Sequence, residues 1–134
     1  MKKLICTVLL AMVLLTACGS TQTQIAAANG FGHTTITPQR AQEMMDQSDM
    51  DVLILDVRHL DEFQAGHIPG AVLLPGNEIN ERAGEVIPDL DQIILIYCRS
   101  GARSHSAALV LVDLGYTAVY DFGGIISWTG DMVR

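Results

Sequence analysis

Two short segments, residues 52–55 and 93–97, are apolar almost throughout. A strand with one wet face alternates polar and apolar residues, so uninterrupted runs of this length are typical of strands buried on both faces of a parallel sheet. Two further short strands are predicted at 71–74 and 118–121. The segments between these strands must therefore supply elements that cover both faces of the sheet.

Helical patterns lie between the predicted strands. Helical segments are expected from Pro38 to about residue 47, within 56–64, at 77–86, at 103–114 and around Trp128. Thr37 is suited to the N-cap of the first helix, with Pro38 at its first position, and Gly115 follows the last turn of the helix at 103–114. Alternation of strands and helices predicts an α/β fold with one domain, a small parallel sheet flanked by helices on both faces.

The first 17 residues differ from the rest of the chain. Lys2 and Lys3 precede an apolar run at 4–15 and the small-residue pair Thr16-Ala17, a pattern typical of a signal peptide. The run is too short for a permanent membrane span, which takes ~20 apolar residues. We predict a signal peptide at 1–17, a flexible tether at 18–33, which is rich in small and polar residues, and a folded domain at 34–134.

The net charge of the chain argues against one class of function, nucleic-acid binding. A chain that starts at Cys18 has six arginines, no lysine and 15 acidic residues, a formal charge of −9. Nucleic-acid binding depends on clustered lysines and arginines, so we expect no nucleic-acid partner. A monomer is the expected state.

The three cysteines have different predicted fates. Residues 15–18, Leu-Thr-Ala-Cys, resemble the lipobox of bacterial lipoproteins, which implies lipidation of Cys18 and an extracytoplasmic protein anchored to a bacterial membrane. The alternatives are ordinary cleavage, which leaves Cys18 as a thiol, and an N-terminal anchor that is not cut. Cys6 would leave with the signal peptide. Cys98 would then be the remaining thiol, in an oxidising compartment.

The seven residues from Cys98 to Ser104 connect the predicted strand at 93–97 to the helix that follows. Backbone N–H groups of such a loop and of the first helical turn are unpaired, and the helix dipole adds partial positive charge there. With arginines nearby, Cys98 is expected to have a lowered pKa and to act as a nucleophile. The residues expected to bind an anionic substrate are Arg99, Ser100, Gly101, Ala102, Arg103 and Ser104.

At these residues the chain resembles the rhodanese family of sulfurtransferases, from about residue 34 to 128. The loop at 98–104 is similar to the family's active-site loop, the segments at 56–58, 62–63 and 66–71 to its first signature, and 123–125 with Trp128 to its C-terminal signature. The resemblance implies that Cys98 accepts a sulfane sulfur from a small anionic donor such as thiosulfate. The resulting persulfide would pass the sulfur to a thiophilic acceptor, with no other cofactor.

Loop length separates this prediction from related cysteine chemistries. Tyrosine and dual-specificity phosphatases place five residues between cysteine and arginine, whereas four separate Cys98 from Arg103. The shorter loop therefore favours sulfur transfer over phosphatase activity. For the same reason it disfavours arsenate reduction. Two alternatives stay open: a non-catalytic, membrane-tethered binding or sulfide-sensing module, and a thiol redox or persulfide-buffering protein.

Several polar residues are predicted to be structural. Asp56 and Arg58 are expected to form an ion pair that shapes the site, and His67 a structural hydrogen bond. His33, His59 and His105 show no spacing typical of a metal site, so no metal is predicted, and His105 is expected on a helix surface.

Overall fold

The computed structural model describes residues 32–134. The predicted signal peptide at 1–17, the predicted lipidation at Cys18 and the tether up to residue 31 lie outside the described residues. Within the described part, no helix is long and apolar enough to cross a membrane.

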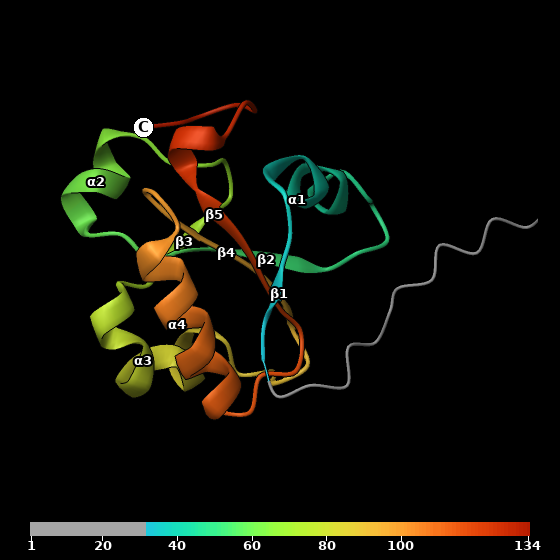
Figure 1. Cartoon of the computed structure of the whole chain (residues 1–134), viewed down its shortest axis with the longest axis vertical. Helices are drawn as coiled ribbons and strands as arrows, with labels where there is room; N and C mark the ends of the chain where they lie inside the picture. The colour runs from blue at the N-terminus through green and yellow to red at the C-terminus, as the bar shows by residue number, and fades with distance from the viewer. Residues whose placement is uncertain (1–31) are drawn as a thin grey trace, which may run out of the picture.

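The described residues form a parallel sheet with the strand order β1-β5-β4-β2-β3. The strands are β1 (Thr34–Thr35), β2 (Val52–Asp56), β3 (Val72–Leu73), β4 (Ile93–Cys98) and β5 (Val119–Gly124). The two apolar runs are β2 and β4, which are neighbours inside the sheet. Helices lie on both faces, which confirms the predicted fold class (Figure 1).

The helices also follow the prediction closely. They are α1 (Pro38–Met45), α2 (Leu60–Ala65), α3 (Ile79–Val86) and α4 (Ala102–Asp113), with 3₁₀ turns η1 (Gly76–Glu78) and η2 (Ile125–Ser127). Thr37 is the N-cap of α1, and its Oγ1 atom accepts a hydrogen bond of 3.1 Å from the Arg40 N–H. The short helix predicted to contain Trp128 is the turn η2, which ends one residue before the tryptophan, so that part of the prediction is wrong.

Strand β4 explains why the apolar runs are continuous. Successive side chains of a strand point to opposite faces of the sheet. Ile94 and Ile96 pack into the cluster beneath α3 and α4, whereas Leu95 and Tyr97 pack into the cluster beneath α1. Both faces of β4 are therefore buried.

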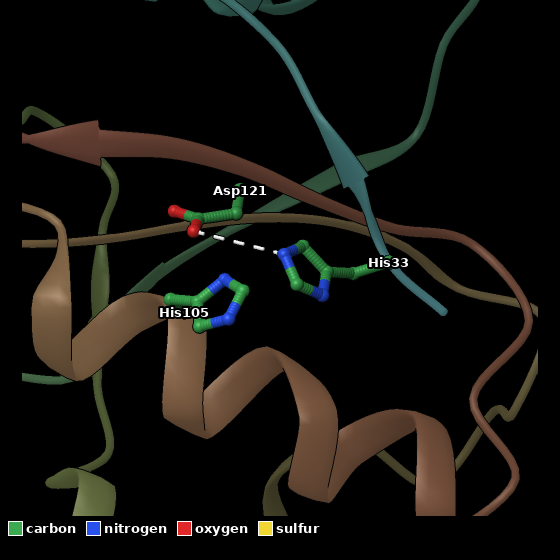
Figure 2. Close-up of side chains that lie close together, drawn as sticks. All are labelled: His33, His105 and Asp121. Carbon is green, nitrogen blue, oxygen red and sulfur yellow. Dashed lines mark ion pairs between the residues drawn. The ribbon is translucent and has the colours of Figure 1, made fainter. Parts of the chain in front are cut away.

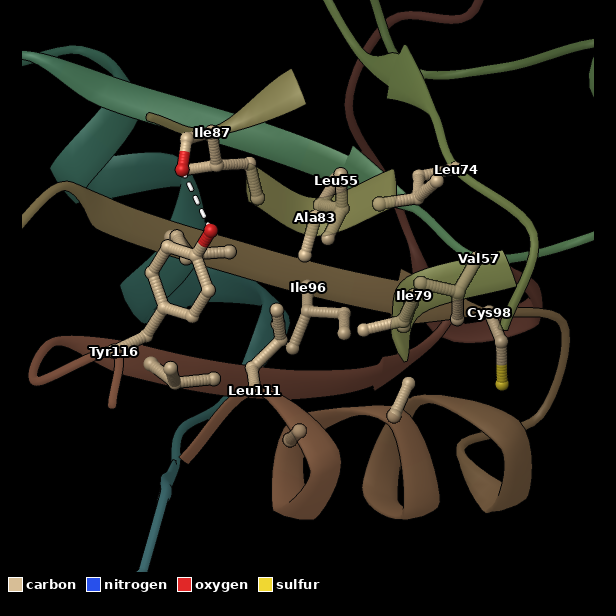
Figure 3. Close-up of a cluster of buried hydrophobic side chains, with 14 residues drawn as sticks. Leu55, Val57, Leu74, Ile79, Ala83, Ile87, Ile96, Cys98, Leu111 and Tyr116 are labelled. Carbon is tan, nitrogen blue, oxygen red and sulfur yellow. Dashed lines mark hydrogen bonds between the residues drawn. The ribbon is translucent and has the colours of Figure 1, made fainter. Parts of the chain in front are cut away.

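The larger hydrophobic cluster, beneath α3 and α4, includes the predicted nucleophile Cys98 (Figure 3). Ala83 of α3 and Leu111 of α4 pack against the sheet. At one end the buried Tyr116 hydroxyl donates a hydrogen bond of 2.6 Å to the Ile87 carbonyl. At the other end lies Cys98, beside the first turn of α4, so the core fixes the position of the thiol.

One strand was not predicted, and one predicted strand is clearly longer than expected. Thr34 and Thr35 are exposed and show no strand pattern, and they form β1 because they pair with Tyr120 and Asp121 of β5. Strand β5 extends beyond the predicted residue 121 to Gly124, which pairs with Cys98 after an irregularity in the ladder.

Candidate active site

Cys98 is the last residue of β4, at the carboxyl edge of the sheet. A three-residue connection separates it from α4, and Gly101 is the N-cap of that helix with φ +105°. This left-handed conformation favours glycine. The turn brings the N-terminus of α4 back over the end of β4, so that the loop curls around the sulfur atom.

Hydrogen bonds to the sulfur favour the thiolate. The Gly101 N–H donates to the Cys98 Sγ atom at 3.0 Å. Burial alone would raise the pKa of Cys98, but the hydrogen bonds from Ser104, Gly101 and Ser100 outweigh it and the pKa is lowered. The lowered pKa of Cys98 agrees with the prediction, and the N–H groups of the loop lie around the sulfur atom.

Ser104 ties the loop to the neighbouring strand. Its side chain is fully buried, and its hydroxyl donates to the Gly101 carbonyl at 3.0 Å and approaches the Gly123 carbonyl at 3.3 Å. The Ser104 backbone N–H lowers the Cys98 pKa most, and the hydroxyl adds to this when it rotates from the carbonyls toward the sulfur. Ser104 therefore positions the loop and stabilises the thiolate.

Gly124 allows β5 to lie directly against the loop. A Cβ atom at this position would be 2.4 Å from the Arg99 carbonyl oxygen and 2.6 Å from the Ser100 Cα atom. Such approaches are far shorter than van der Waals contact, so no other residue fits without moving the loop. The sequence motif at 123–125 thus has a steric reason.

The two loop arginines differ in their surroundings. Arg103 donates two hydrogen bonds to the Glu62 carboxylate, at 2.6 and 2.8 Å. These bonds hold the pKa of Glu62 at about 2. Arg99 is exposed, and within residues 32–134 its side chain makes no ion pair or hydrogen bond.

It follows that Arg99 is the loop arginine available to a substrate, whereas Arg103 is already held by α2. Glu62 lies in a segment that resembles the family's first signature, but its bond to Arg103 was not predicted. The only sequence signal for it was an acidic residue in the first turn of α2.

The residues predicted to be structural have that role. Arg58 Nε lies 3.0 Å from both carboxylate oxygens of the buried Asp56, and one of its terminal nitrogens donates to the Gly66 carbonyl at 2.8 Å. The His67 Nδ1 atom is 2.9 Å from the Phe63 carbonyl, and the two rings stack at 3.7 Å. Together these contacts fasten α2 and the turn after it to the sheet.

A cavity of about 480 Å³ lies beside the first turns of α4. Its lining includes Val57, His59, Asn77, Ala102, Arg103 and Ser106. These residues come from separate segments, so local sequence patterns do not reveal the cavity. It offers space for a molecule next to the loop.

Comparison with known proteins agrees with this geometry. A family model described as the rhodanese-like domain matches residues 37–131. A sulfurtransferase from Allochromatium vinosum is 46% identical over 79 residues, which cover 58% of this chain and 72% of that protein. Thiosulfate sulfurtransferase GlpE from Pseudoalteromonas translucida is 37% identical over 99 residues, which cover 73% of this chain and 89% of that protein.

A solved structure described as rhodanese with anions from E. coli aligns with a TM-score of 0.59 at 31% identity, covering 62% of this chain and 98% of that one. Sulfurtransferases of the rhodanese family use a covalent cysteine persulfide and no cofactor. The family match extends over most of the folded domain and includes the Cys98 loop. The chain belongs to the rhodanese-like family.

Proposed function

We propose that the protein is a sulfurtransferase that moves a sulfane sulfur from a small anionic donor such as thiosulfate to a thiophilic acceptor through a persulfide on Cys98. The observation that carries the proposal is the loop around Cys98: a buried thiol that accepts the Gly101 N–H at 3.0 Å and has a lowered pKa.

The first half-reaction is the attack of the Cys98 thiolate on the outer sulfur of thiosulfate. A new S–S bond forms, the S–S bond of thiosulfate breaks, and sulfite leaves with the electron pair. The exposed Arg99 guanidinium is suited to hold the sulfonate oxygens of the donor. The negative charge then lies on the terminal sulfur, where the loop N–H groups stabilise it.

In the second half-reaction a nucleophilic acceptor attacks the terminal sulfur and restores the Cys98 thiolate. Neither half-reaction needs an added oxidant or reductant. Because the enzyme alternates between thiolate and persulfide, ping-pong kinetics are expected.

The loop favours this role over the alternatives. Four residues separate Cys98 from Arg103, too few for the wider cradle of a phosphatase. A purely binding module would not need a buried thiol with a lowered pKa. A redox or persulfide-buffering protein would use the same cysteine, and it differs in that it would not turn over.

The test is a steady-state assay of the purified protein with thiosulfate and cyanide that follows thiocyanate. We expect turnover in the parent, parallel double-reciprocal lines and no turnover in Cys98→Ser. Absence of turnover in the parent, or equal turnover in Cys98→Ser, contradicts the enzymatic proposal.

We further propose that the mature protein is extracytoplasmic and anchored to a bacterial membrane by lipid at Cys18. The support is the lipobox-like sequence at 15–18 after an apolar run. Several acyl chains at ~0.8 kcal/mol per buried methylene would make release very slow. Mass spectrometry of the protein extracted from membranes should find acyl chains on an N-terminal Cys18, and Cys18→Ala should lack them. A membrane-bound parent protein whose Cys18 carries no lipid would exclude this anchor.

A further inference from the structure

Three side chains from separate segments converge at the edge of the sheet near the loop (Figure 2). His33 immediately precedes β1, Asp121 lies on β5 and His105 lies on α4. One potential ligand atom of each lies within 4.8 Å of the others. The rings of His33 and His105 meet edge to face, with centroids 4.8 Å apart.

His33 is buried without adequate partners. Its side chain is only 6% exposed. Within residues 32–134 its Nδ1 atom has no hydrogen-bond partner, and its Nε2 atom faces the Asp121 carboxylate at 4.0 Å, beyond hydrogen-bond distance. Burial of an unsatisfied polar group costs about 1–3 kcal/mol. The 4.0 Å gap between Nε2 and the Asp121 carboxylate points to a partner that lies between these two groups, and such a partner would leave Nδ1 unsatisfied.

The Asp121 carboxylate is already oriented for such a partner. Its Oδ1 atom accepts a hydrogen bond of 2.9 Å from the Gly123 N–H, which leaves Oδ2 directed at His33. Its side chain is also 6% exposed, so this carboxylate carries a buried negative charge. A hydrogen bond that fixes a ligating carboxylate is a usual feature of metal sites.

Contrary to the expectation from histidine spacing, we propose that His33, His105 and Asp121 form a binding site for a divalent transition metal of the zinc class. Two imidazoles and one carboxylate are a ligand set that suits Zn²⁺, and three protein ligands leave a position for water. The cation would neutralise the buried carboxylate and satisfy one nitrogen of His33. His105 is exposed, which gives ions access from solvent.

The distances require a small adjustment. Zinc bonds of 2.0–2.1 Å place tetrahedral ligand atoms roughly 3.4 Å apart. The longest separation here is 4.8 Å. The contraction of about 1.4 Å is within reach of the exposed His105 side chain on the surface of α4, and the buried pair of His33 and Asp121, 4.0 Å apart, would have to close by about 0.6 Å.

The site is a few residues from the sulfur chemistry but independent of it. His105 follows Ser104 along α4, and Gly123, which donates to Asp121, lies on the loop side of β5. None of the three proposed ligands contacts the reacting sulfur in the proposed function. The proposal can therefore fail or succeed without affecting that function.

The experiment titrates the chelator-treated full chain with Co²⁺, followed by competition with Zn²⁺. We expect one equivalent of metal and a visible d–d band without the near-ultraviolet band of thiolate-to-cobalt charge transfer. His105→Gln and Asp121→Asn should each weaken binding at least about tenfold, since even residues outside the ligand set cost that much. His59→Gln, a matched exposed histidine outside the cluster, should bind like the parent.

Three results overturn the proposal: no binding at one equivalent, binding unchanged in His105→Gln and Asp121→Asn, or a thiolate charge-transfer band that places the metal on cysteine. His105 is exposed, so His105→Gln is expected to fold, and it decides the outcome should Asp121→Asn fail to fold.

Discussion

Gly124→Ala tests how tightly the geometry of the loop controls sulfur transfer. The added Cβ atom would lie 2.4 Å from the Arg99 carbonyl oxygen and 2.6 Å from the Ser100 Cα atom, where ordinary contacts begin near 3.4 Å. Relief of the clash requires the loop to move away from β5 by about 1 Å. A displacement of that size at a reacting group can cost about 100-fold in rate.

We therefore expect thiocyanate formation by Gly124→Ala to fall about 100-fold, with about 1–3 kcal/mol lost from the free energy of unfolding through overpacking. The matched control is Gly84→Ala, in α3, where the added Cβ atom meets nothing within 4 Å. The control should keep full activity and gain about 0.5–1 kcal/mol of stability from helix propensity.

The assay measures thiocyanate formation at saturating cyanide, together with urea unfolding of both variants. A folded Gly124→Ala variant with activity within about threefold of the parent would refute the reasoning. It would show that contact between β5 and the loop does not set the position of the thiol.

The remaining predictions concern charge and protonation. Alkylation of Cys98 by iodoacetamide should slow as pH falls through its lowered pKa, with a midpoint below the ordinary value of about 8.5. Ser104→Ala should raise that midpoint by about 1–2 pH units, because a hydrogen bond to a charged group contributes about 1.5–3 kcal/mol. Ser106→Ala, on the same helix, should leave the midpoint unchanged. Equal midpoints in the two variants would contradict the role of Ser104. Arg99→Ala should raise the KM for thiosulfate by about tenfold or more, for loss of one charge-assisted hydrogen bond, and an unchanged KM would remove Arg99 from donor binding. Arg103 lowers the pKa of the Glu62 carboxylate from 4.5 to about 2, so this carboxylate stabilises the fold above pH 4.5 and loses that effect as pH falls toward 2. In Glu62→Gln, the free energy of unfolding in urea should therefore depend less on pH between these values. An unchanged slope would contradict this.

The fold was predictable because its central strands carry a strong pattern. Burial of β2 and β4 on both faces leaves uninterrupted apolar runs, and the N-cap at Thr37 and the glycine after α4 mark helix boundaries. Strand β1 was not predictable, since Thr34 and Thr35 are exposed and become a strand only through pairing with β5.

The loop was predictable for a similar reason. Cys98 to Ser104 is continuous in sequence, and a strand followed by a helix fixes where its N–H groups point. Contacts between distant segments were not: the bond from Arg103 to Glu62 spans 41 positions. The approach of His33 to His105 and Asp121 likewise depends on strand order, which local patterns do not contain.

The central claim is that Cys98 carries the transferred sulfur, and mass spectrometry of the protein and of its peptides after brief exposure to thiosulfate tests it most directly. We predict a gain of one sulfur atom on the peptide that contains Cys98, lost on addition of cyanide and absent in Cys98→Ser. An unmodified Cys98 peptide after exposure to thiosulfate, in a protein that still forms thiocyanate, would contradict the account.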